Sequence, residues 1–143
     1  MATTVYTTQA KMARLLSPDG LANFSDHDQS GTPDTDVISD CIAEATETIA
    51  ALLWKRYTAN TLASSVLIQH WATVSACYFL CIRRGNGPPA SIAAEYERIM
   101  GKDGLCERLA SGNITLADVP MKVCNVPTFS NVTIDRRYPR EKI

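Results

Sequence analysis

The fold is decided by residues 64–84, which read Ser64-Ser65-Val66-Leu67-Ile68-Gln69-His70-Trp71-Ala72-Thr73-Val74-Ser75-Ala76-Cys77-Tyr78-Phe79-Leu80-Cys81-Ile82-Arg83-Arg84. Apolar side chains fall on nearly every face of this stretch, which predicts a buried central helix. A membrane span is the rival interpretation, but polar residues interrupt the run and the chain holds no second candidate span. Burial within the protein is therefore favoured, with His70 as a hydrogen-bonded packing residue.

Three further helices are predicted around this one. Residues 35–57 repeat apolar side chains at three- and four-residue steps, from Ile38 to Leu52 and Leu53, with acidic residues on the other side. A short helix is expected over residues 8–16, and another begins with Ser91 as N-cap and is weakened at Gly101 without necessarily ending there. The expected fold is mainly α: a small bundle of about four helices, residues 1–118, with an extended C-terminal arm, residues 119–143.

Composition bounds the function. The 143 residues suit one domain, and 14 basic against 15 acidic residues give a net charge of -1, so nothing draws the chain generally to nucleic acid or to an anionic membrane. The N-terminus shows no secretory signal. The five cysteines are an odd number, and four of them lie in apolar or helix-like surroundings, which predicts reduced and buried thiols with neither a disulfide framework nor a zinc set.

An acidic loop precedes the second predicted helix and has two interpretations. Asp26, Asp28, Ser30 and Asp34 are spaced like the first ligands of a calcium-binding loop, with Gly31 at the sixth position. The twelfth position, where a bidentate Glu should stand, is Val37. The alternative is a helix start, with Thr35 as N-cap and flanking carboxylates at the positive end of the helix dipole.

No catalytic constellation is found, since the chain has no nucleophile elbow, phosphate-binding glycine loop or metal-binding helix motif. We therefore expect no enzyme activity and no cofactor. Two stretches remain as candidates for interactions. The first is a basic arm containing Arg136, Arg137, Tyr138 and Arg140, and the second is the basic and aromatic end of the second predicted helix, Trp54, Arg56 and Tyr57, which can pack on the core or form the edge of an interface.

The order of several segments resembles the tailed-phage head-to-tail adaptor family, over roughly residues 7–116. A short N-terminal helix is followed by Leu21-Ala22-Asn23-Phe24-Ser25-Asp26 and the acidic glycine loop. The next helix ends Ala51-Leu52-Leu53-Trp54-Lys55-Arg56-Tyr57, and later come Tyr96-Glu97-Arg98 and Leu109-Ala110-Ser111-Gly112-Asn113-Ile114-Thr115-Leu116.

This resemblance implies a virion protein, made in the host cytoplasm, that forms a homo-oligomeric ring, commonly of twelve copies, beneath the portal protein. Such a ring extends the channel through which DNA passes without sequence-specific binding, and it docks the next neck or tail protein. The C-terminal arm would contact the portal or neighbouring subunits. Two alternatives from other classes are a small helix-turn-helix DNA-binding regulator, prompted by the pair Arg83-Arg84, and a calcium-binding interaction module.

Overall fold

A computed structural model describes residues 4–83, 85 and 87–122. The protein is mainly helical, as predicted, and its described part forms a small bundle without strands. In those ranges no helix is long and apolar enough to cross a membrane. Seven helices are present in the described residues instead of about four, and in chain order they are α1 (Gln9–Leu16), α2 (Pro18–Ser25), α3 (Thr35–Leu53), α4 (Ala59–Ser64), α5 (Val66–Ile82), α6 (Ala90–Met100) and α7 (Leu105–Ser111).

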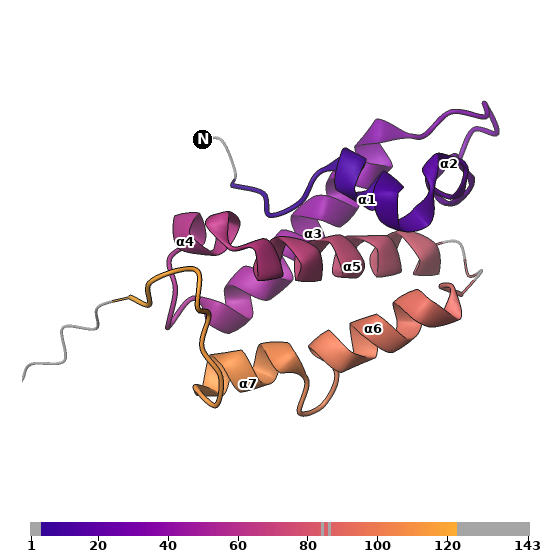
Figure 1. Cartoon of the computed structure of the whole chain (residues 1–143). Helices are drawn as coiled ribbons and strands as arrows, with labels where there is room; N and C mark the ends of the chain where they lie inside the picture. Colours follow the sequence, from indigo (N-terminus) through magenta and orange to yellow (C-terminus); the bar gives the residue numbers. More distant parts are fainter. Residues whose placement is uncertain (1–3, 84, 86, 123–143) are drawn as a thin grey trace, which may run out of the picture.

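The central helix is α5, as its all-round apolar pattern predicts. It packs against α3, with α1 and α2 above it and α6 below it in Figure 1, while α7 packs against α3 and α6. Its residues 71–77 are all buried, and Trp71 is only 1% exposed. Its first turn is different, because Val66 is 73% exposed.

Two apolar clusters fill the bundle, and α3 and α5 contribute to both. One surrounds Trp71 and takes side chains from α4, α6 and α7. The other surrounds Cys41 and Cys77 and takes side chains from α1 and α2. Because these two helices span both clusters, they form the rigid axis of the molecule.

Two helices, α2 and α4, are not apparent from the sequence, because each is short and starts at a residue that favours turns. The stretch after α1, expected only as a stop, instead begins α2: the Ser17 hydroxyl accepts from the Gly20 N–H at 3.2 Å and Pro18 occupies the first turn. Thr58 caps α4 in the same way. Too few residues follow in either case for an apolar period to be visible.

The boundaries of two predicted helices also need correction. Asp34, not Thr35, is the N-cap of α3, because its carboxylate accepts from the N–H groups of Asp36 and Val37 at 3.0 and 3.3 Å. This helix ends at Leu53, before the predicted end at residue 57. The residue at the N-cap position of α6 is Pro89 and not Ser91, and no side chain caps that helix.

The predicted fourth helix is in fact two. A side chain at Gly101 would place its Cβ 2.3 Å from the Glu97 carbonyl oxygen, and one at Gly104 would lie 2.6 Å from that of Ile99. The loop between the two helices passes close to these carbonyl groups, and glycine permits that close approach. It therefore leaves α6 at Met100 and begins α7 at Leu105.

Candidate interaction surface

Residues 113–122, here called the strap, close one end of the bundle. They follow Gly112, which ends α7 in the left-handed conformation with a φ of 94°. The Leu116 N–H donates to the Tyr57 hydroxyl at 3.2 Å, and the Lys122 N–H donates to the Arg56 carbonyl at 2.7 Å. These bonds fix the strap across the turn that joins α3 to α4.

The strap also caps the central helix. The carboxylate of Asp118 accepts from the Ser65 hydroxyl and from the Val66 N–H, both at 3.1 Å. A negative group at this place satisfies an unpaired backbone donor and faces the positive end of the helix dipole. The role of Asp118 cannot be recognised from the sequence, because no local pattern signals a cap that comes from 52 residues further along the chain.

Arg56 and Tyr57, two of the three predicted packing or interface residues, hold the strap in place. Tyr57 is 1% exposed and its hydroxyl is the acceptor for Leu116. The guanidinium of Arg56 donates to the Leu109 carbonyl at 3.0 Å and to the Met121 sulfur at 3.0 Å. Arg56 and Tyr57 therefore make packing contacts within the domain.

Trp54, the third of these residues, lies outside. It is 59% exposed, and the ammonium groups of Lys55 and Lys122 each lie 5.8 Å from the centre of its ring. The Lys122 ammonium also donates to the Trp54 carbonyl. Such cations over an indole face make a favourable electrostatic contact.

Two other large apolar side chains are exposed, one near the end of α3 and one on the strap. Leu52, expected in the buried stripe of α3, is 46% exposed because Leu53 takes the inward position one residue later. Met121, on the strap, is 47% exposed. We call the region formed by Trp54, Lys55, Met121 and Lys122 the Trp54 surface.

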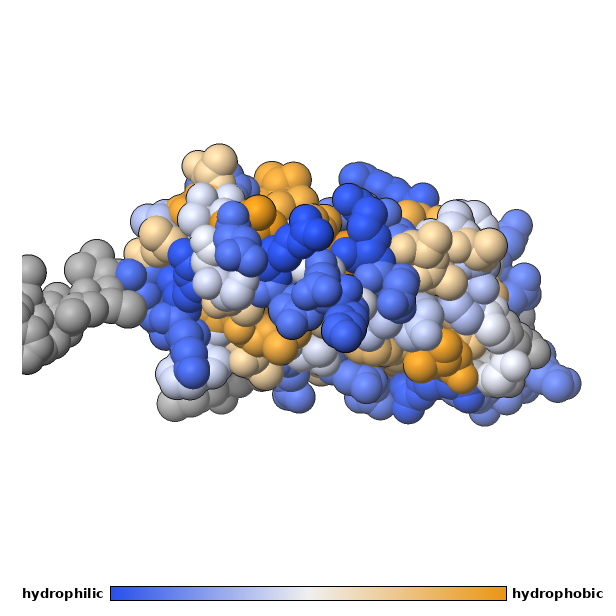
Figure 2. Space-filling model, turned by 90° about the horizontal axis from the view of Figure 1, so that it is seen from below, coloured by the Kyte–Doolittle hydropathy of each residue, from blue (hydrophilic) through white to orange (hydrophobic). Residues whose placement is uncertain are grey.

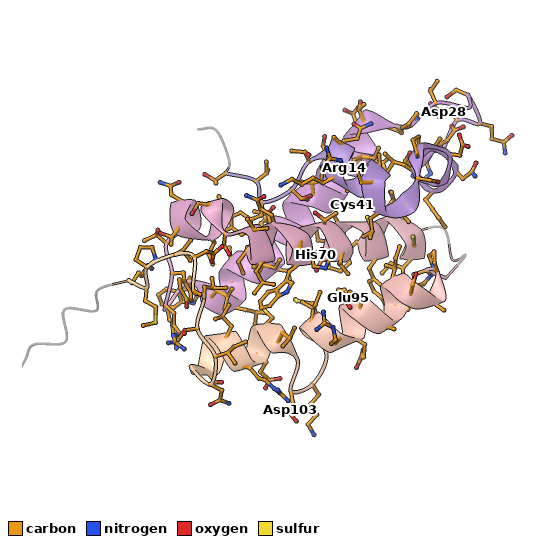
Figure 3. The ribbon with its side chains drawn as sticks, in the orientation of Figure 1. Arg14, Asp28, Cys41, His70, Glu95 and Asp103 are labelled. Carbon is orange, nitrogen blue, oxygen red and sulfur yellow. The ribbon has the colours of Figure 1, made fainter. Side chains whose placement is uncertain are left out.

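The acidic loop is folded around its own backbone. The carboxylate of Asp26 accepts from the Gly31 N–H at 2.7 Å and from the Ser30 N–H at 3.1 Å. These bonds, above all the one from Gly31, hold the pKa of Asp26 below its ordinary value. Asp34 is occupied as the cap of α3, and Asp28 lies at the tip of the loop (Figure 3).

The structure therefore does not assemble Asp26, Asp28, Ser30 and Asp34 into an ion site. In the described ranges, no group of three or more His, Cys, Asp or Glu side chains is arranged to hold a metal ion. The helix-start interpretation accounts for the loop, with Asp34 in the role given to Thr35.

Beyond the loop, a row of carboxylates runs along α3. Asp36, Asp40, Glu44 and Glu47 are all exposed, and their spacing of four, four and three places them on one side of the helix. Both ion pairs found between described residues are made by Glu95, so none involves this row. We call these four residues the α3 stripe.

His70 was expected to be a hydrogen-bonded packing residue, but it lies at the surface. Half of its side chain is exposed, and its Nε2 lies 3.5 Å from a carboxylate oxygen of Glu95 (Figure 3). Hydrogen bonds from the Arg98 guanidinium, with a smaller contribution from His70, hold the pKa of Glu95 below its ordinary value. His70 also borders two shallow hollows of about 350 and 500 Å³, one towards α1 and one towards the strap.

The predicted arm residues, Arg136, Arg137, Tyr138 and Arg140, lie outside the described residues. What the structure does fix is the place from which that segment starts. It begins after Lys122, whose backbone and side chain are both bonded at the end of α3.

A family model described as Bacteriophage Mu, Gp36 matches residues 6–122, which is most of the chain. The matched range ends with the strap and includes both the Trp54 surface and the α3 stripe. No curated protein gives a significant match to the chain.

Proposed function

Because the chain belongs to the bacteriophage Mu Gp36 family, we propose that this phage protein is a structural component of the particle, a head-to-tail adaptor rather than an enzyme. Copies of it form a ring, of twelve in this proposal, beneath the portal protein. The ring extends the DNA channel and docks the next neck or tail protein.

The observation that carries the proposal is the anchoring of the strap. Three separate contacts, from Leu116, Asp118 and Lys122, hold it to the bundle. The arm therefore follows Lys122, a residue with a defined position beside the exposed Trp54. An anchored base with a basic segment beyond it suits docking onto an acidic surface of a larger assembly.

The arm is expected to make the portal contact. Replacing Arg136, Arg137 and Arg140 together by Ala should weaken binding to purified portal rings at least tenfold, because three charge-assisted contacts are removed. The helical content should not change, since the arm lies beyond every described helix. Light scattering of the mixture with portal rings measures the mass bound, and circular dichroism checks the fold.

Lys102→Ala is the matched control, because Lys102 is an exposed cation at the turn between α6 and α7. It should bind portal rings like the unchanged protein. If the triple variant binds portal rings as tightly as the control does, the arm is not the contact. If the protein does not bind portal rings and instead shifts a DNA band in electrophoresis, the DNA-binding regulator replaces the adaptor as the proposed function.

A further inference from the structure

We infer that neighbouring copies join through the Trp54 surface of one copy and the α3 stripe of the next. This inference rests on the ring in the proposed function and names the two surfaces that build it. Both surfaces consist of described residues, and both lie within the part of the chain matched by the family.

The Trp54 surface has the composition of an interface centre. Tryptophan and its aromatic neighbours carry a large share of binding energy where they become buried between proteins. Here a large indole stands 59% exposed, and Met121, which precedes Lys122 in the strap, is 47% exposed. Figure 2 shows that hydrophobic patches remain on the face of the molecule that it draws. The folded chain leaves these apolar groups facing solvent.

The charges of this surface select the partner. Lys55 and Lys122 flank the indole, so a complementary surface must be acidic. The chain itself supplies such a surface, because residues 15–54 contain eight acidic residues and neither Lys nor Arg. Half of those eight form the α3 stripe.

A single copy cannot bring its own two surfaces together. The stripe ends at Glu47, and Lys55 lies eight residues further on, roughly 12 Å along the axis of a helix that rises 1.5 Å per residue. Because α3 is continuous through Leu53, that separation is fixed. The lysines of one copy can therefore meet the stripe only on another copy.

The resulting contact joins two different patches, the end of one α3 and the side of the next. Such heterologous contacts repeat from copy to copy, and they close into a ring when the rotation between copies allows it. An end-to-side contact turns each copy relative to the last. The inferred pairing therefore has the symmetry that a ring beneath the portal needs.

Two charge-reversal variants test the pairing. The first carries Lys55→Glu with Lys122→Glu, and the second carries Asp40→Lys with Glu44→Lys. Each variant alone sets like charges against each other at the contact, so its self-association constant should fall at least tenfold. Mixed in equal amounts, the two variants present opposite charges again at both contacts, and the mixture should assemble like the unchanged protein. Sedimentation velocity of each variant and of the mixture gives the measurement.

The matched controls reverse one charge outside the two surfaces. Lys102→Glu lies on the α6–α7 turn and Asp28→Lys at the tip of the acidic loop, and neither should change assembly. Recovery on mixing also shows that both variants are folded. If the unchanged protein assembles but the mixture does not recover, the pairing is wrong while the adaptor proposal stands. If the unchanged protein assembles neither alone nor on portal rings, the adaptor proposal itself fails.

Discussion

Among single residues, Gly112 combines two constraints that distinguish it from the other glycines. Its φ of 94° lies where side chains with a Cβ are strained, and a Cβ there would lie 2.7 Å from the Arg56 guanidinium. Gly31 shares the first constraint, with a φ of 78°, but has open space around it. Substituting each glycine by Ala therefore distinguishes the cost of backbone strain alone, at Gly31, from the cost of strain with a steric contact, at Gly112.

We expect Gly31→Ala to lower the free energy of unfolding by about 1 kcal/mol, the cost of a left-handed conformation for a residue other than glycine. Gly112→Ala should cost more, about 2–3 kcal/mol, because Arg56 must also move away from its carbonyl partner. Urea unfolding followed by circular dichroism measures both. Equal losses in the two variants would mean that Arg56 moves aside freely.

Asp26 should respond to pH in a defined direction. Its carboxylate is held ionised by backbone N–H groups, so its folded pKa is lowered and the loop bonds are complete above the ordinary range for Asp. As pH falls through the lowered pKa, protonation removes the acceptors and the loop should loosen. An NMR titration of the Gly31 amide should follow this step in the unchanged protein and lose it in Asp26→Asn. A Gly31 signal that titrates equally in both proteins would contradict this account.

At the scale of whole helices, α5 depends on a cap that does not belong to it. Asp118→Ala should lower the free energy of unfolding by about 1–2 kcal/mol, because it removes an acceptor for two donors and a favourable charge at the helix start. Asp28→Ala, an exposed carboxylate in the loop, should change it by less than about 0.5 kcal/mol. Hydrogen exchange at the Val66 amide should rise only in the first variant. No change there would show that Ser65 caps the helix alone.

The helices that could be predicted from sequence are those with enough turns to show a period. The buried pattern of residues 64–84 and the stripe from Ile38 to Leu53 identified α5 and α3, although their ends were misplaced by a few residues. The short α2 and α4 could not be found this way, since Ser17 and Thr58 are equally typical of turns. Gly101 is predicted only to weaken the fourth helix, and the folded backbone shows why Gly101 and Gly104 separate α6 from α7.

The candidate surfaces were predicted in part for the same reason. The basic and aromatic residues 54–57 were identified as a packing or interface edge, yet sequence could not say that Tyr57 would be buried and Trp54 exposed. The burial of Tyr57 depends on its contact with the strap, which lies more than fifty residues further along the chain. The role of Asp118 has the same origin, and long-range contacts of this kind leave no periodic mark in a sequence.

Across the whole molecule, the prediction of buried cysteines is confirmed for the described ones. Cys41, Cys77, Cys81 and Cys106 are all buried free thiols. Burial raises the pKa of Cys77 to about 12 and those of Cys81 and Cys106 to about 11, so almost no reactive thiolate exists near neutral pH. In a Cys124→Ser variant, a thiol reagent at about pH 8 should therefore react only as fast as the protein opens. In denaturing guanidinium the same four thiols should react at once, and rapid labelling without denaturant would show that the bundle opens far more readily than its packing implies.

The strap also has a consequence for the order in which the protein can be made. The residues that complete the core and cap its central helix leave the ribosome after all the described helices have been synthesised. Until then Tyr57 lacks its partner and the first turn of α5 lacks part of its cap. A chain that stops short of residue 116 therefore lacks the contacts that finish the bundle and the lysine that flanks Trp54. The bundle is therefore complete only once translation has passed the strap.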